Sequence, residues 1–186
     1  EFLEINKINL DGLINSQYGE VNVDLNFLLS SNYFSDLIYS GKVIFNEFEL
    51  GDCLNNDLLG QVSCQVILDG EGVDSNFKTN IKLMDGEFNL NGYPYSNISL
   101  LGELSSKNYK GKLDIRDVNG NLHFNGNIDF LKSIPKYNFS VSLYDVNFEK
   151  LNFNLNDSIT NFSGNFSGNF SGKSLNDIQG QLLGNE

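Results

Sequence analysis

The 186-residue sequence contains no tryptophan, a single histidine, two cysteines and two prolines. One histidine and two cysteines are too few for the convergent ligand sets of metal sites or for a base paired with a nucleophile. Basic residues are also scarce, because 12 lysines and arginines stand against 24 acidic residues, for a net charge of −12. Nucleic acids and anionic headgroups both attract clustered basic side chains. We therefore expect no enzyme, no cofactor and no nucleic-acid partner.

Long apolar runs are absent as well. No stretch approaches the roughly eighteen consecutive apolar residues typical of a membrane-spanning helix. The chain begins at Glu1 in a strand-like pattern and not in a basic, then apolar, signal segment. We expect an excised part of a longer protein, with any membrane anchor outside this fragment. Because 40% of the residues are hydrophobic and 19% are charged, residues 1–186 are expected to fold as one domain.

Period-two alternation of apolar and polar residues dominates what is present. In residues 111–130, two alternating stretches flank an Asn119-Gly120 pair, whose residues tolerate the positive φ angles of a tight type I′ turn. This pattern predicts a β-hairpin with its apolar side chains on one face. Similar stretches recur roughly every eleven to thirteen residues and predict an all-β, antiparallel meander of about fourteen strands. A sheet of that size with one apolar face must curl or be covered.

A few segments depart from the alternation. Apolar residues spaced three and four apart predict one or two helical turns within residues 33–40, 51–59 and 174–178. The Asp85-Gly86 pair predicts a turn between two short strands, and residues 146–155 predict a compact turn followed by a strand.

The residues with reactive side chains show no convergent pattern. His123 alternates with asparagines and is expected on the polar face, without a second ligand in reach. Cys53 and Cys64 lie eleven residues apart, and a disulfide between them stays open as an alternative. We favour a free Cys64, since its place on the apolar face suits a thiol that packs as a small hydrophobe. The acidic loop 69–74 fits a turn better than a calcium template. No catalytic residue, cofactor-binding residue or metal ligand is predicted.

Several short turn motifs follow one another along residues 41–182. They are Leu50-Gly51 with Leu58-Leu59-Gly60, Gly70-x-Gly72, Asn91-Gly92-Tyr93-Pro94-Tyr95, Asp117-Val118-Asn119 before Gly126-Asn127-Ile128-Asp129-Phe130, Pro135 with Tyr137-x-Phe139, and Gly172-Lys173-Ser174-Leu175-Asn176-Asp177-Ile178-Gln179-Gly180. Taken in this order, the motifs resemble the C-terminal part of the TamB/AsmA-like cell-envelope family, the large subunit of the translocation and assembly module. Cys53 is not part of the family pattern.

The resemblance implies a periplasmic β-groove, a long antiparallel sheet rolled into a taco shape that is hydrophobic inside and polar outside. Proteins of this family are thought to carry phospholipid between the inner and outer membranes and to assist outer-membrane protein assembly. The implied partners are phospholipid acyl chains and an outer-membrane β-barrel, and the implied inner-membrane anchor lies outside this fragment.

The alternation also predicts which side chains line such a groove. Residues of like parity on successive strands share one face of a sheet. The candidates for contact with acyl chains are Leu113, Ile115, Leu122, Phe124, Ile128, Phe130, Phe139, Val141, Phe162, Phe166 and Phe170.

Two other arrangements fit the same period. A fragment of an outer-membrane β-barrel would turn its apolar face outward to lipid, with aromatic girdles at the strand ends. A β-sandwich, as in adhesins and carbohydrate-binding modules, would cover the apolar face with a second sheet and leave no groove.

Overall fold

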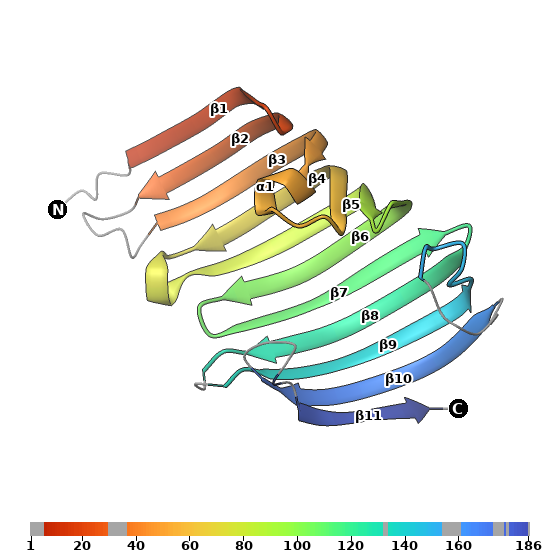
Figure 1. Ribbon diagram of the computed structural model, residues 1–186. Coiled ribbons are helices and arrows are strands. Elements are labelled where there is room, and N and C mark those ends of the chain that lie inside the picture. Colours follow the sequence, from red (N-terminus) through yellow and green to blue (C-terminus); the bar gives the residue numbers. More distant parts are fainter. Residues whose placement is uncertain are drawn as a thin grey trace.

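The computed structural model describes residues 6–29, 37–131, 134–153, 161–172, 177 and 179–185. These residues form one antiparallel sheet of eleven strands, in which each strand pairs with the next along the chain (Figure 1). The strands are β1 (Asn6–Ser16), β2 (Gly19–Leu29), β3 (Leu37–Glu49), β4 (Leu59–Glu71), β5 (Lys78–Leu90), β6 (Tyr93–Ser105), β7 (Asn108–Asp117), β8 (Gly120–Asp129), β9 (Lys136–Val146), β10 (Phe162–Ser171) and β11 (Gln179–Asn185). The predicted all-β meander is confirmed.

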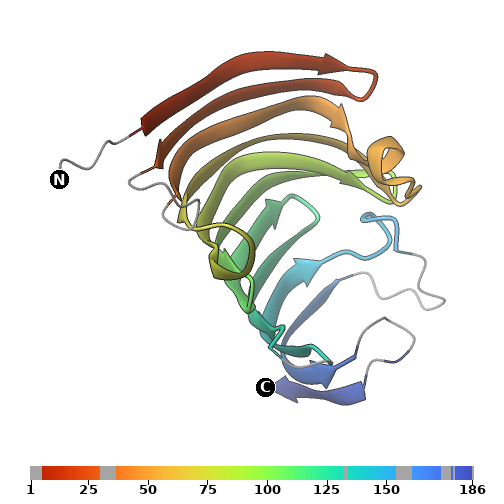
Figure 2. The same ribbon diagram turned by 90° about the vertical axis from the view of Figure 1, so that its left-hand side faces the viewer.

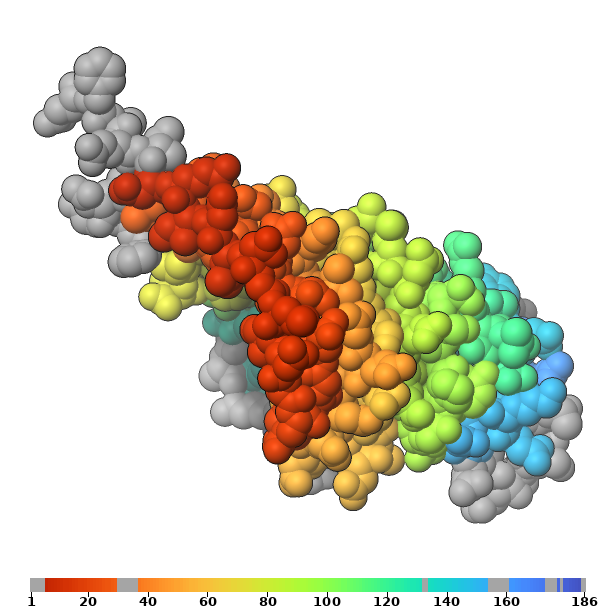
Figure 3. Space-filling view, turned by 90° about the horizontal axis from the view of Figure 1, so that it is seen from above, coloured from red at the N-terminus to blue at the C-terminus, as the bar shows by residue number. Residues whose placement is uncertain are grey.

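The sheet is open and strongly bent. Within the described residues, β1 and β11 each pair on one side only, so the sheet does not close on itself. Figure 2 shows that the strands bow along their length and that the later strands turn beneath the earlier ones. Seen from above, the edge strand β1 stands in front and the other strands follow in chain order (Figure 3). The result is a trough with one concave and one convex face.

β-Bulges help to bend the strands. Glu47, Asp85 and Asn97 have positive φ angles of 45°, 52° and 51°, and the strand register shifts close to Glu47 and Asp85. An extra residue on one strand bends it and increases its twist. The turn predicted at Asp85-Gly86 is therefore wrong, because β5 continues through this pair as a bulge.

The described residues form eleven strands, fewer than the roughly fourteen predicted for the chain. The bulge at Asp85 joins two predicted strands into one, and residues 147–153 form turns in place of the predicted strand. The hairpin of β7 and β8 is confirmed, but its turn is centred on Val118 and Asn119, since Asp117 pairs with Gly120.

The helix predictions have different outcomes. The helix expected within residues 51–59 is confirmed as the short α1 (Leu50–Leu54). Residues 37–40 lie in β3, so the predicted helix is wrong there, and residues 33–36 lie outside the described residues. Of the segment 174–178 only Asp177 is described. The 3-10 turn η2 (Asp74–Asn76) joins β4 to β5.

Candidate functional site

The concave face carries an apolar row that crosses every strand of the sheet. Directly opposed residues on antiparallel strands share a face and lie close together. The strand register places the following residues opposite one another in succession from β1 to β11: Gly12, Val23, Val43, Val66, Leu83, Leu100, Leu113, Phe124, Val141, Phe166 and Gly184. No charge interrupts this row of described residues.

A second row runs beside the first and is rich in glycine. It consists of Leu10, Leu25, Gly41, Leu68, Ile81, Gly102, Gly111, Gly126, Phe139, Gly168 and Leu182. Aromatic rings from neighbouring positions fold over several of these glycines. A Cβ added at Gly126, for example, would lie 2.6 Å from the ring of Phe124. The glycines thus leave room for large rings against the floor of the trough.

The rings stack across strands at the C-terminal end of the trough. The centroids of Phe124 and Phe139 lie 5.9 Å apart, and those of Phe139 and Phe170 lie 5.6 Å apart. Phe162 and Phe166 stack along β10 at 5.8 Å. The repeated Asn-Phe-Ser-Gly sequence of β10 therefore supplies one side of an aromatic lining.

The structure brings together the predicted lining residues that lie on strands. Leu113, Phe124, Val141 and Phe166 share the first row, and Phe139 lies in the second. The pairs Ile115–Leu122 and Ile128–Tyr137, with Tyr137 opposite Phe170, occupy the same face on either side. Phe162 opens β10 opposite Val146. Phe130 differs, because it follows the last residue of β8 and is 42% exposed.

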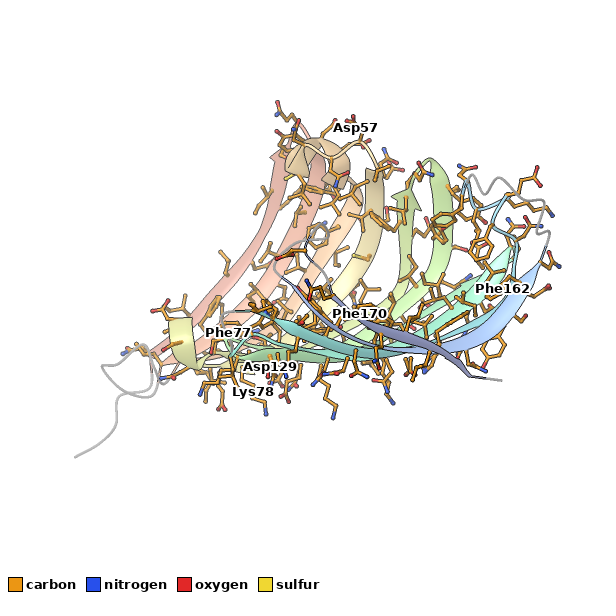
Figure 4. All side chains as sticks on the ribbon, turned by 60° about the horizontal axis from the view of Figure 1, so that its bottom comes forward. Asp57, Phe77, Lys78, Asp129, Phe162 and Phe170 are labelled. Atoms are coloured by element: carbon orange, nitrogen blue, oxygen red, sulfur yellow. The ribbon has the colours of Figure 1, made fainter. Side chains whose placement is uncertain are left out.

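The convex face is mostly polar, although it also carries the exposed side chains of Leu13, Ile38, Ile67 and Leu101. Polar side chains on neighbouring strands meet there: Lys78 Nζ lies 3.1 Å from a carboxylate oxygen of Glu103, and His123 Nδ1 lies 2.5 Å from a carboxylate oxygen of Asp114. Figure 4 shows the labelled Lys78 projecting below the sheet, whereas Phe170 lies on the opposite face, which faces the trough. His123 is exposed, as its alternation predicts.

The connection after β9 covers part of the concave face. Leu151 and Val146 are each only 5% exposed and pack with Tyr95 in the buried apolar cluster of the described residues. The side chains of Phe148 and Phe153 meet edge to face, with their centroids 6.1 Å apart. We call residues 147–153 the rim cover.

Hydrogen bonds hold the rim cover against two other turns on the same side of the trough. The Asn91 and Asn152 side chains each donate to the backbone carbonyl oxygen of the other residue, at 2.7 and 3.1 Å. The Asn147 backbone N–H donates to the carbonyl oxygen of Asn119 at 2.8 Å. The rim cover is thereby tied to the β5–β6 turn and the β7–β8 turn.

An apolar cavity of about 340 Å³ lies between the rim cover and the strands. Its walls come from β5 to β9 on one side, including Leu90, Ile115 and Leu143, and from Phe148 and Leu151 on the other. The sequence interpretation missed this feature. Its only local signal is the spacing of apolar residues within 148–153, which resembles that of an ordinary buried turn.

A polar cluster borders the same turns. The Tyr93 hydroxyl donates to a carboxylate oxygen of Asp117 at 2.5 Å and accepts from the Asn119 side chain at 2.9 Å. Desolvation and the adjacent carboxylate raise the pKa of Tyr93 above its ordinary value. The hydroxyl therefore stays protonated and fixes the start of β6 to the β7–β8 turn.

Reactive side chains do not converge in the described part of the chain. Cys53 is exposed on α1 and Cys64 is half-buried on β4, and both are free thiols. No group of three histidine, cysteine, aspartate or glutamate residues there could hold a metal ion. The described helices are also too short and too polar to cross a membrane.

The functional candidate among the described residues is therefore the extended apolar surface of the concave face. Its apolar lining extends over the whole width of the sheet, and the rim cover bounds one part of it. Comparisons of the chain with known protein families, with curated proteins and with solved structures found no match.

Proposed function

We propose that the concave face binds lipid acyl chains, as a segment of a periplasmic β-groove that conducts phospholipid between the inner and outer membranes. In this role the protein serves outer-membrane biogenesis and protein assembly, together with an outer-membrane β-barrel and an inner-membrane anchor. The observation that carries the proposal is the apolar row that crosses all eleven strands of an open sheet.

The exposure of this face supports a hydrophobic occupant. Near the N-terminal edge, Ile8, Leu10 and Ile14 are 60%, 51% and 56% exposed although their neighbours on β2 are apolar. Large contiguous apolar surfaces in contact with water are rare in monomers and usually mark an interaction site. Each CH₂ group that such a surface removes from water stabilises the complex by about 0.8 kcal/mol.

The length of the apolar row supports the passage of lipid along the trough more than the binding of one lipid at a fixed site. Neighbouring strands lie about 4.8 Å apart, so a row across eleven strands follows a path of roughly 48 Å. The hydrocarbon core of a bilayer is about 30 Å thick, so one leaflet contributes about 15 Å. The row is thus about three acyl chains long. The mostly polar convex face and the net charge of −12 suit a conduit in which the lipid headgroups remain in water.

The two other arrangements fit the geometry less well. A β-sandwich needs a second sheet over the apolar face, and all described strands belong to one sheet. A sheet that faced surrounding lipid would carry its apolar side chains on the convex side, where Lys78 and Glu103 form an ion pair instead.

Photo-crosslinking tests the proposal. Crosslinkers at positions 124 and 128 should capture lipid in cells, whereas one at the matched position 125 should not, because Asn125 lies on the convex face between them. Phe124→Asp should block lipid capture, since a desolvated charge there costs roughly 2 kcal/mol or more. Asn125→Asp should change little. Equal labelling at all three positions, or none in a folded protein, would refute lipid binding by this face.

A further inference from the structure

The cavity beneath the rim cover differs from the rest of the trough. Here Phe148, Leu151 and Phe153 lie opposite the strands and bound a partly open cavity of about 340 Å³. None of the described residues that line the cavity carries a charge, and Asn121 is the only amide side chain among them.

The cavity is continuous with the concave face. Ile115 and Leu122 line the cavity. Ile115 is the next residue after Leu113 on the concave face of β7, and Leu122 is the residue before Phe124 on the same face of β8. Val141 belongs both to the cavity wall and to the first apolar row. A flexible chain that lies on the row can therefore enter the cavity without crossing a polar surface.

We propose that the cavity holds the methyl end of an acyl chain and that the rim cover is the wall against which this end rests. The inference depends on the proposed function, since it names which part of the lipid this part of the face receives. The methyl end is the part that fits, because a charged or zwitterionic headgroup would lose its hydration among these side chains without compensating partners. The apolar lining also offers bound water few of the polar partners that it needs.

The absence of tryptophan makes the position of the chain end measurable. Phe153→Trp places one fluorophore in the cavity wall, and Phe27→Trp places one on the concave face of β2, opposite Tyr39. Tyr144→Trp is the matched control, because Tyr144 is 52% exposed and follows the cavity residue Leu143 on β9. Each variant is titrated with two fatty acids, one brominated near the methyl end and the other near the carboxylate. Bromine quenches tryptophan on contact.

We expect the methyl-end probe to quench Phe153→Trp several-fold more than the carboxylate-end probe. Tyr144→Trp should show weak quenching that is the same for both probes. Phe148→Trp is a second reporter in the same wall if Phe153→Trp does not fold, as judged by circular dichroism.

Three results would overturn the inference, and they distinguish its failure from that of the proposed function. Equal quenching of the cavity reporter by both probes, or quenching of Phe27→Trp alone, would show that the trough binds acyl chains but that the cavity does not hold the methyl end. No quenching of any folded variant would show that the concave face does not bind acyl chains at all.

Discussion

Adding one methyl group at the floor of the trough should destabilise the protein. In Gly126→Ala, the new Cβ would lie 2.6 Å from Cζ of Phe124 and 3.1 Å from the backbone oxygen of Asn138. The ring can turn away, but the backbone of β9 is fixed by the sheet. Overpacking of this kind costs about 1–3 kcal/mol, and the smaller entropy of the unfolded chain offsets about 0.4–1 kcal/mol of it. We expect a net loss of roughly 0.5–2 kcal/mol in the free energy of unfolding.

Urea denaturation with a matched control measures this loss. Gly12→Ala is the control, because it lies on the same face of β1 and a Cβ added there has no other atom within 4 Å. This variant should gain about 0.4–1 kcal/mol from the unfolded state alone. Combining Gly126→Ala with Phe124→Leu should restore part of the lost stability, as a double-mutant cycle would reveal. If Gly126→Ala were stabilised as much as Gly12→Ala, the rings would not be packed against the glycines as described.

Two further predictions concern groups whose pKa is raised. Burial raises the pKa of Cys64, so at pH 8 iodoacetamide should alkylate the exposed Cys53 faster than Cys64. Mass spectrometry of the two cysteine peptides measures both rates, and equal rates would contradict the prediction. Because folding raises the pKa of Tyr93, its contribution to stability is complete below the ordinary value of 10.0 and is lost as the pH rises through the folded value. Tyr93→Phe should lower the free energy of unfolding by about 1 kcal/mol at pH 7, because the hydrogen bond to Asp117 is lost. The variant should also lose less stability than the original protein above pH 10, and thermal melts over a pH series measure both effects.

The sequence predicts the two faces of the sheet because alternation is local. Once Leu113 and Phe124 are assigned to strands, their parity decides which face they occupy, and hairpin connections align neighbouring strands. The same logic places His123 on the polar face. The second row, which is rich in glycine, could be predicted only in part. The sequence shows which face Gly126 occupies, but its position opposite Gly111 depends on the strand register.

Other features depend on contacts between distant segments. Asp85-Gly86 reads as a turn because both residues tolerate positive φ angles, yet a bulge uses the same tolerance while β4 and β6 keep pairing with β5 on either side. The rim cover is held by Asn91 and Asn152, which lie 61 residues apart. No local pattern encodes that contact, so the cavity could not be predicted.

The regular spacing of the apolar row affects how a hydrocarbon would move over it. A displacement by one strand, about 4.8 Å, exchanges each contact for another of nearly the same kind, such as Val43 for Val66 or Leu83 for Leu100. Between Val23 and Leu113 the energy along the row is therefore nearly level, so strong total adhesion there is compatible with fast one-dimensional diffusion. Dispersion attraction has no preferred direction, and the row contains no ion pair that must break at each step.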